Sequence, residues 1–495
     1  MNKYLATVKI FLLGLGLSQV IATFQLYLSN VKLQEKLTIL RDLGYFIIPT
    51  ERIAAHLNAI GPAFWGGFFF TLTLGTGLTL LGYAAGRIRS HCLRNRRICD
   101  CITGALWLAA SVAVYLDGYS IIATSYFVIV PPAVFFATLR LASQQPSLKQ
   151  ELIPLIPLIL LAMIWLTLLD RSLFLNIRDG MLLSNPAGIA INDLYYDYTL
   201  YPAEVIKPLQ KKTLKTVSLE NVPDGTLKDS IDGALRRHDY LDIGGEEGAD
   251  LVITEKTGKL LFEHRGRLLL ETGTDEFLKG PGIVLKEFSS LNDRYRLFRR
   301  FTFFSLLVGL PILIYGFVFV LVRFPLSFFL SDAKASIVAA ALCFILGVVV
   351  FFPVYGGVRT TLSSATLAQA LTSNDIHERI AALKRIQSRR LDIGTFPSYE
   401  RSLTSPSVPE RYWLAVALGL SHRRETYADL LRLLNDPHPN VVCKALEGLG
   451  VRDGKGAVET IIHTIKSSDH WYCQWYGYRA LRDLGWTQKE SMEKH

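Results

Sequence analysis

Four residues that could ligate a metal lie within one short segment: His91, Cys92, Cys99 and Cys101. Imidazole nitrogen and thiolate sulfur are ligands that zinc prefers, so a zinc site is the first chemistry to consider. The Cys-x6-Cys-x-Cys spacing differs from the usual zinc-finger arrangement, however, and five arginines in the same segment would repel a divalent cation. We therefore expect ordinary thiols here and no metal site.

A second group of candidates lies near the middle of the chain. His238 and Asp239 are adjacent there, and four carboxylates follow around a glycine-rich turn: Asp242, Glu246, Glu247 and Asp250. The spacing does not match a calcium-binding loop, so a solvated acidic turn is the expected structure. We predict no catalytic, cofactor-binding or metal-binding residue in the chain.

Three large aromatic residues near the end of the sequence share one helix face. Trp471, Trp475 and Tyr478 follow the i, i+4, i+7 spacing of a helix, on a face offset from that of Ala480 and Leu484. Tryptophan and tyrosine combine a large apolar area with few rotamers, which is why they dominate many interfaces. We predict that the three side chains are exposed and form a docking surface for a protein partner, a lipid headgroup or another part of this chain.

The elements that position these residues include long apolar segments without any charge. Seven such runs occur, and six of them contain 18 to 25 residues. At 1.5 Å per residue these six can cross a hydrocarbon core of roughly 30 Å. The third has only 15 residues but continues through Asp117-Gly118 into the fourth, as expected for a tight helical hairpin. The runs are Ile10–Leu28, Pro62–Gly86, Ile102–Leu116, Gly118–Leu139, Leu152–Leu169, Phe301–Val322 and Ala335–Val358.

The runs divide the chain into four parts. Residues 1–169 contain five runs, residues 170–300 form a soluble insert, residues 301–358 contain two more runs, and residues 359–495 form a soluble tail. We therefore predict a polytopic α-helical membrane protein with seven spans, arranged as five plus two, that carries a small α+β insert and an all-α tail. The lipid bilayer is its first expected partner.

The composition agrees with this class. Half of the residues are apolar, 19% are charged, and the mean hydropathy is +0.28. The net charge of +10 is not concentrated on one face, so we expect no nucleic-acid partner.

The seven runs contain no Asp, Glu, Lys, Arg or His, whereas ion-coupled transporters usually place such groups near the bilayer centre. Gln19 and Gln25 are the most polar side chains of the first run, and we expect them to bond to a neighbouring helix.

The distribution of basic residues predicts the orientation. The loop from Gly86 to Cys101 carries five arginines and only one carboxylate, so the positive-inside rule places it in the cytoplasm. Counting spans then places the insert and the tail together on the other side, outside a bacterial inner membrane. One group disagrees, because four arginines crowd the outer end of the sixth run: Arg294, Arg296, Arg299 and Arg300.

The soluble insert combines one helix with several strands. Apolar spacing predicts a helix over residues 227–240. Strands are predicted over residues 213–219, 250–255, 259–264 and 267–271. A helix followed by an antiparallel meander predicts a small α+β domain. A tyrosine-rich stretch, residues 195–201, follows the fifth run and could form either an interfacial aromatic anchor or a binding groove.

The tail contains a repeated motif. An A-L-x-x-L/I core recurs at Ala382, Ala445 and Ala480, with a looser copy at Ala415, so successive copies start 33, 30 and 35 residues apart. This pattern resembles the short HEAT-like repeats found in phycobilin lyases and many bacterial proteins. The resemblance covers about residues 375–486, and it implies paired helices stacked into a solenoid. It implies a binding scaffold and no lyase activity, because HEAT arrays share no catalytic residues.

Three functions are compatible with these features. We favour a non-enzymatic membrane scaffold, whose HEAT-like tail and insert form a docking platform for a protein partner on one side of a bacterial membrane. The second is a component that handles transported solutes, lipids or glycans along the spans, several of which contain proline. The third is a membrane enzyme with its site where the insert meets the membrane. No motif identifies a small-molecule substrate.

Overall fold

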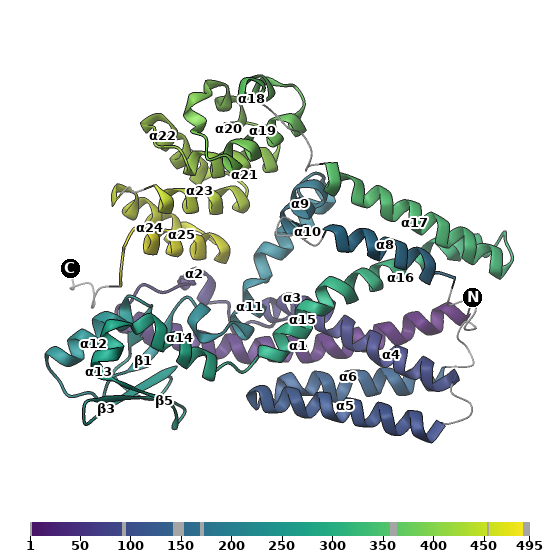
Figure 1. The fold of residues 1–495 in the computed structure, drawn as a ribbon, viewed down its shortest axis with the longest axis horizontal. Coiled ribbons are helices and arrows are strands. Elements are labelled where there is room, and N and C mark those ends of the chain that lie inside the picture. Colours follow the sequence, from purple (N-terminus) through teal and green to yellow (C-terminus); the bar gives the residue numbers. More distant parts are fainter. Residues whose placement is uncertain are drawn as a thin grey trace.

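The structure of the protein is a computed structural model that describes residues 2–91, 96–141, 153–168, 173–356, 364–452 and 455–488. The chain is mostly helical, with one small mixed sheet (Figure 1). In these described ranges, six helices are long and apolar enough to cross a membrane. They are Leu5–Asp42, Ile60–His91, Arg97–Gly118, Ile121–Arg140, Arg296–Leu326 and Asp332–Phe351.

The first helices form a bundle in which α1 packs against α3 and α6, α4 packs against α6, and α5 packs against α6. Glycines in α4 allow the close approach of α6. A Cβ at Gly82 would lie 2.7 Å from the carbonyl oxygen of Pro131, and one at Gly86 would lie 2.7 Å from Thr138. The bounds are α1 (Asn2–Asp42), α2 (Glu51–Ala54), α3 (Ile60–Phe70), the π-helical turn η1 (Thr71–Gly75), α4 (Thr76–His91), α5 (Arg96–Gly118) and α6 (Ile121–Arg140).

Polar side chains inside this bundle bond across helices, as the sequence predicted for Gln19 and Gln25. The Gln19 side-chain nitrogen donates to the carbonyl oxygen of Phe64 (2.8 Å), and its oxygen accepts from the Thr71 hydroxyl (2.7 Å). The Gln25 side-chain oxygen accepts from the hydroxyl of Tyr126 (3.0 Å). Each glutamine therefore ties α1 to another helix of the bundle.

A second group of helices lies beside the first bundle (Figure 1). Here α17 packs against both α16 and α8. The fifth apolar run corresponds to α8, which has only 14 residues in the structure, and the two ends of that run lie outside the described residues. The bounds are α8 (Leu155–Leu168), α15 (Arg296–Phe304), the π-helical turn η5 (Ser305–Gly309), α16 (Leu310–Leu326) and α17 (Asp332–Gly356).

The insert folds as two separate parts. The first, which we call the connector, consists of α9 (Leu173–Ile177), the π-helical turn η3 (Arg178–Leu182), α10 (Pro186–Tyr198) and α11 (Leu200–Ile206). Its buried apolar residues from Leu183 to Val205 belong to a core shared with the bundle and the tail, whereas Leu173 packs in a small separate cluster. The second part, the sheet domain, has its own core extending from Leu209 to Phe288.

The sheet domain contains five strands in the order β2-β1-β3-β4-β5. Strand β1 pairs in parallel with β2 and β3, whereas β3, β4 and β5 pair antiparallel. The predicted antiparallel meander is present as β3, β4 and β5. The whole sheet is mixed, because β1 pairs in parallel with β3 and with the short strand β2, which was not predicted. The bounds are β1 (Lys215–Ser218), β2 (Tyr240–Asp242), β3 (Leu251–Lys256), β4 (Lys259–His264), β5 (Arg267–Gly273), α12 (Thr226–Arg236), α13 (Thr274–Lys279) and α14 (Pro281–Leu291), with the 3-10 turn η4 (Leu209–Lys211) before β1.

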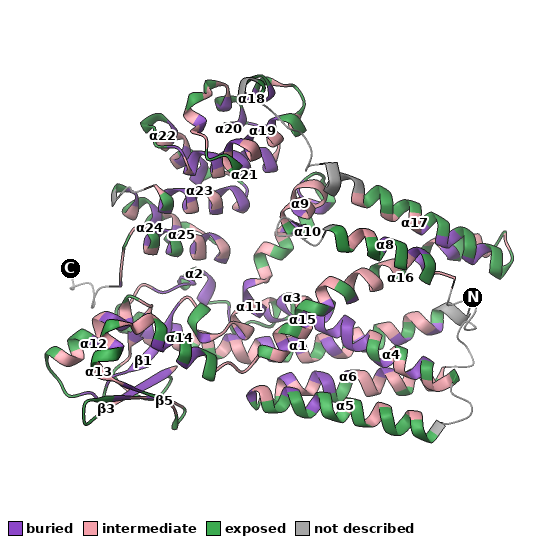
Figure 2. Ribbon diagram, in the orientation of Figure 1, coloured by how far each residue is buried: buried purple, intermediate pink, exposed green. Residues whose placement is uncertain are grey.

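The tail is entirely helical in its described residues. Helices α19, α21, α23 and α25 pack one on the next, and their burial is visible in Figure 2. A Cβ at Gly419 would lie 2.7 Å from the Cα of Gly448, so these glycines let α21 and α23 approach closely. The bounds are α18 (Ser364–Thr372), α19 (Ile376–Ser388), η6 (Ile393–Thr395), η7 (Pro397–Tyr399), α20 (Glu400–Leu403), α21 (Val408–Gly419), α22 (Arg424–Arg432), η8 (Leu433–Asn435), α23 (Pro439–Val451), η9 (Lys455–Ala457), α24 (Val458–Ser467) and α25 (Trp471–Asp483).

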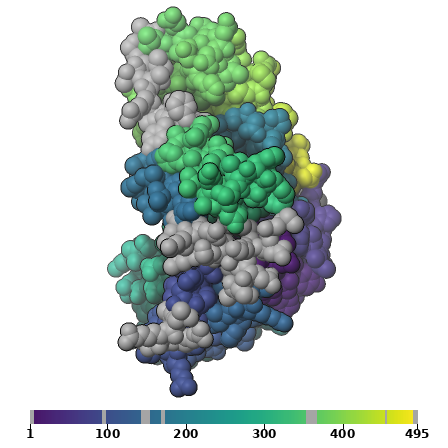
Figure 3. Space-filling view, turned by 90° about the vertical axis from the view of Figure 1, so that its right-hand side faces the viewer, coloured from purple at the N-terminus to yellow at the C-terminus, as the bar shows by residue number. Residues whose placement is uncertain are grey.

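The tail and the sheet domain both lie beyond the same end of the long helices (Figure 1). The turn from α16 to α17 lies at the opposite end, and Figure 3 views the molecule from that end, with the tail at the top. The tail and the sheet domain are also in direct contact, because Tyr478 bonds to Asp239.

Candidate functional site: the junction of the tail with the rest of the chain

The connector lies against the side of the tail formed by α19, α21, α23 and α25. Asp179 in η3 is bonded to two tail residues, accepting from the indole of Trp413 (2.7 Å) and from the ammonium of Lys384 (2.7 Å). The neighbouring Arg178 pairs with Asp179 (2.5 Å) and stacks over the ring of Tyr412, at 3.7 Å from the ring centre. One buried carboxylate and one guanidinium of the connector therefore attach it to α19 and α21.

Two histidines of the tail pair with two aspartates of α10. His438 lies 3.4 Å from Asp193, and His470 lies 3.2 Å from Asp197. The aspartates are four residues apart and so share one face of α10, while the histidines stand at the N-terminal ends of α23 and α25. The hydrogen bond that His470 donates to Asp197 raises the pKa of His470, whereas burial lowers the pKa of His438.

Aromatic rings fill the space between the connector and α25. The rings of Tyr196 and Tyr472 have centroids 4.7 Å apart, and those of Tyr201 and Trp471 are 5.0 Å apart and perpendicular. Burial raises the pKa of Tyr201 to about 12. The tyrosine-rich stretch of the connector therefore faces the tail. This position favours neither an interfacial aromatic anchor nor a binding groove, the two roles predicted for it.

The three predicted docking residues lie at this junction, and the prediction that all are exposed is wrong for two of them. Trp471 is only 6% exposed because it packs on Tyr201, and Tyr478 is 2% exposed. The Tyr478 hydroxyl donates to the carboxylate of Asp239 in the sheet domain (2.7 Å). Trp475 is half-buried, with the ammonium of Lys207 5.6 Å from its ring. Of the docking partners predicted for this helix face, the structure shows another part of the chain, through Tyr201 and Asp239.

The loop between α1 and α3 also contacts the tail, through residues that sequence reasoning missed. Gln474 in α25 accepts from the backbone amide of Thr50 (2.8 Å) and donates to the Thr50 hydroxyl (2.7 Å). The Gln488 side chain accepts from the backbone amide of Phe46 (3.0 Å) and donates to the backbone carbonyl of the same residue (2.7 Å). Both glutamine side chains are buried, and neither belongs to a motif that could have identified it.

Asp250, one of the candidates of the acidic turn, has structural partners. Asp250 accepts from the ammonium of Lys36 (2.6 Å), which lies in the extension of α1, and from the backbone amide of Thr216 (3.1 Å). Burial opposes ionisation of Asp250, but the Lys36 charge and these bonds outweigh it and lower the pKa of the carboxyl. The turn therefore attaches the sheet domain to the end of α1.

The segment with the metal-ligand candidates contains no assembled site in the part that the structure describes. His91 ends α4, and Cys99 and Cys101 lie in the first turns of α5, whereas Cys92 lies outside the described residues. Across the described ranges, no group of three or more His, Cys, Asp or Glu residues is placed to hold a metal ion.

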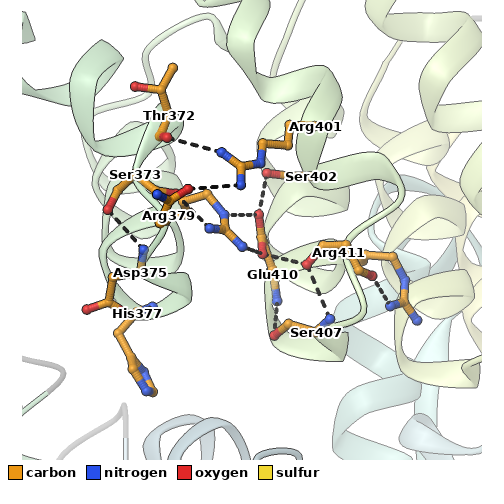
Figure 4. A network of polar contacts seen from close by, with 12 residues as sticks. Thr372, Ser373, Asp375, His377, Arg379, Arg401, Ser402, Ser407, Glu410 and Arg411 are labelled. Carbon is orange, nitrogen blue, oxygen red and sulfur yellow. Dashed lines mark hydrogen bonds and ion pairs between the residues drawn. The ribbon is translucent and has the colours of Figure 1, made fainter.

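Inside the tail, a buried ion pair fixes the first helices to one another (Figure 4). Glu410 in α21 accepts from two nitrogens of Arg379 (2.7 and 2.8 Å) and from the hydroxyls of Ser402 and Ser405 (both 2.6 Å). Burial raises the pKa of the Glu410 carboxyl, but these four bonds outweigh it and lower the pKa below the usual value. The segment between α19 and α21 is thereby held against both helices.

Comparison with known proteins gives no match to a family model, to a curated protein or to a solved structure. The resemblance of the tail to HEAT repeats therefore stays a prediction that rests on the motif.

Proposed function

We propose that the protein is an integral membrane scaffold whose tail, connector and sheet domain form one docking platform on a single side of a bacterial inner membrane. The observation that supports this most strongly is the position of α25. This helix bonds to the loop after α1 through Gln474, packs on the connector through Trp471, and bonds to the sheet domain through Tyr478. A helix in contact with three separate parts of the chain would hold them together as one unit.

The proposed topology has seven spans, with α8 as the short fifth span. In support, α8 packs against α17, and the chain segments that follow the two helices lie at the same end (Figure 1). The arginine-rich loop lies at the other end and would face the cytoplasm, with the platform outside. Two of the conflicting arginines engage carboxylates, since Arg299 pairs with Asp293 and Arg296 lies 3.9 Å from Asp117.

The tail would be a short HEAT-like solenoid, because the helices with the A-L-x-x-L/I core (α19, α23 and α25) and the looser copy (α21) pack in sequence order. The face of the array that meets the connector is covered within the chain. A protein partner would therefore bind the opposite helices, α22 and α24, or the sheet domain.

Cross-linking in native membranes, followed by purification and quantification of partners, tests this proposal. We expect a defined partner to be lost when Trp471→Ala loosens the platform, and to be retained with Trp475→Ala, which alters a half-buried side chain of the same helix. Equal partner recovery from both variants, together with proof that Trp471→Ala has released the tail, would contradict the proposal.

A further inference from the structure

A polar hollow of about 330 Å³ lies where the sheet domain meets the end of α25. It belongs to neither part alone, because eight of its lining residues come from the sheet domain and one, Arg482, comes from the tail. Its size falls in the range of small-molecule sites. The lining residues are Gln210, Lys215, Arg237, His238, Asp239, Tyr240, Gly282, Leu285 and Arg482.

A buried ammonium lines this hollow without a carboxylate bonded to it. Lys215 is 4% exposed, and its Nζ donates to the carbonyl oxygen of Lys212 (3.1 Å) and lies 5.2 Å from the ring centre of Tyr240. An ammonium has three donors, so this single hydrogen bond leaves two of them to be satisfied. Asp239 and Asp250 are near enough to influence its pKa, but within the described ranges neither forms an ion pair with it.

The remaining charges around the hollow are mostly positive. Arg237 is exposed at its edge, and Arg482 donates to the backbone carbonyl of Arg237 (2.6 Å). The one carboxylate in the lining, Asp239, already accepts from Tyr478 and pairs with Arg482 (3.2 Å). The hollow therefore has an excess of cationic donors, with two charged groups that still have capacity for a ligand, Lys215 and Arg237.

The imidazole of His238 lies directly over the first turn of α14. A Cβ at Gly282 would come within 3.1 Å of this ring, so glycine leaves the room that the imidazole occupies. Burial, followed by the charges of Lys215 and Arg237, lowers the pKa of His238. The ring is therefore mostly neutral at pH 7, and the positive charge of the hollow comes from Lys215, Arg237 and Arg482.

We propose that this hollow binds a small oxyanion, a phosphate or a carboxylate group, with Lys215 and Arg237 as its charged ligands. An oxyanion supplies acceptors for the unused donors of the ammonium and for the planar guanidinium. Arg482 of α25 lines the same hollow, so the anion would lie at the boundary between the sheet domain and the tail. This proposal goes beyond the scaffold role, because it gives the platform a ligand.

Binding of inorganic phosphate to the full-length protein in detergent, measured by equilibrium dialysis and by thermal unfolding, tests the proposal. We expect saturable binding to the wild type. We expect Lys215→Met to weaken binding about tenfold or more, as for the loss of a hydrogen bond to a charged group. Arg237→Gln changes an exposed side chain, so it should weaken binding severalfold without affecting the fold. Lys256→Met removes the same charge from an exposed site of β3 and is the matched control.

The stability of Lys215→Met gives a second readout, because burial lowers the pKa of Lys215 to about 8 and charging this site is therefore costly. Without an anion, Lys215→Met should unfold at a higher temperature than the wild type at pH 7. With saturating phosphate, the wild type should gain stability and the variant should not.

Parallel titrations with acetate and with dihexanoyl phosphatidic acid distinguish a carboxylate and a lipid phosphate from a free phosphate. Saturable binding of any of the three anions that is lost in Lys215→Met and kept in Lys256→Met supports the proposal. The absence of saturable binding of all three, or equal losses in Lys215→Met and Lys256→Met, would overturn it.

Discussion

Tyr478 in the last helix donates a 2.7 Å hydrogen bond to the carboxylate of Asp239, a residue 239 positions earlier in the chain. Asp239 has a positive φ of 61°, a conformation that aspartate tolerates better than most residues. The same carboxylate also pairs with Arg482 of the tail. A single tight turn of the sheet domain is thus bonded twice to the tail.

Removing the phenol hydroxyl should loosen this contact. Tyr478→Phe deletes a bond to a charged acceptor, which is worth about 1.5–3 kcal/mol, and leaves the ring in place. We expect faster hydrogen exchange in α25 and in β2, with the helices of the membrane bundle unchanged. Tyr476→Phe on the same helix is the control, and equal exchange rates in the two variants would show that the bond does not hold the tail.

Truncating Trp471 should release the tail from the connector. Trp471→Ala removes a buried indole, at a cost of about 3–5 kcal/mol, whereas Trp475→Ala removes a half-buried one and should cost less. The measurement is the rate of limited proteolysis within the tail. A rate in Trp471→Ala that stays at the wild-type value would mean that the aromatic contact contributes little to docking.

The two histidine–aspartate pairs predict opposite pH dependences. The raised pKa of His470 means that its pair stabilises docking fully below the unfolded value of 6.5 and loses this effect as pH rises through the folded pKa. The lowered pKa of His438 means that stability is lost as pH falls below 6.5 through its folded pKa. Docking, measured by proteolysis from pH 5 to pH 8, should therefore be strongest near pH 6.5.

Single variants separate the two histidines. His470→Gln should abolish only the loss of docking that occurs as the pH rises above 6.5. His438→Asn keeps an acceptor for the first turn of α23 and should abolish the loss on the acid side only. A pH profile that neither variant changes would rule out both pairs as its origin.

Breaking the buried ion pair of the tail should unfold its first helices. Arg379→Ala leaves the fully buried carboxylate of Glu410 without its cation, which costs about 3–5 kcal/mol. Arg401→Ala removes only exposed bonds to Thr372 and Asn374 and is the control, expected to be nearly neutral. Circular dichroism melting of the two variants checks this, and similar melting temperatures would contradict it.

The sequence predicted the local features of the fold well, because these depend on neighbouring residues. Lack of charge over long runs located the membrane-length helices, and alternation with turn residues located the strands 259–264 and 267–271 almost to the residue. Strand β2 was missed because its three residues form a strand only through parallel pairing with β1.

The junction could be predicted only in part. Helical spacing correctly grouped Trp471 with Tyr478, but spacing along one helix does not show what covers its face. That cover comes from Tyr201 and Asp239, which are far away in the sequence. Gln474 and Thr50 could not have been identified at all, since a buried glutamine bonded to a distant backbone leaves no local pattern.

Labelling of single cysteines in sealed cells and in inverted vesicles tests most directly whether the sheet domain and the tail lie on one side of the membrane, as a single platform requires. Ser230→Cys and Ser467→Cys place thiols at exposed sites of the two parts, and the native Cys101, exposed near the start of α5, reports on the opposite end of the helices. With the other cysteines replaced, we predict that an impermeant maleimide labels residues 230 and 467 from one face, and Cys101 only from the other. Labelling of 230 and 467 from opposite faces would contradict the account.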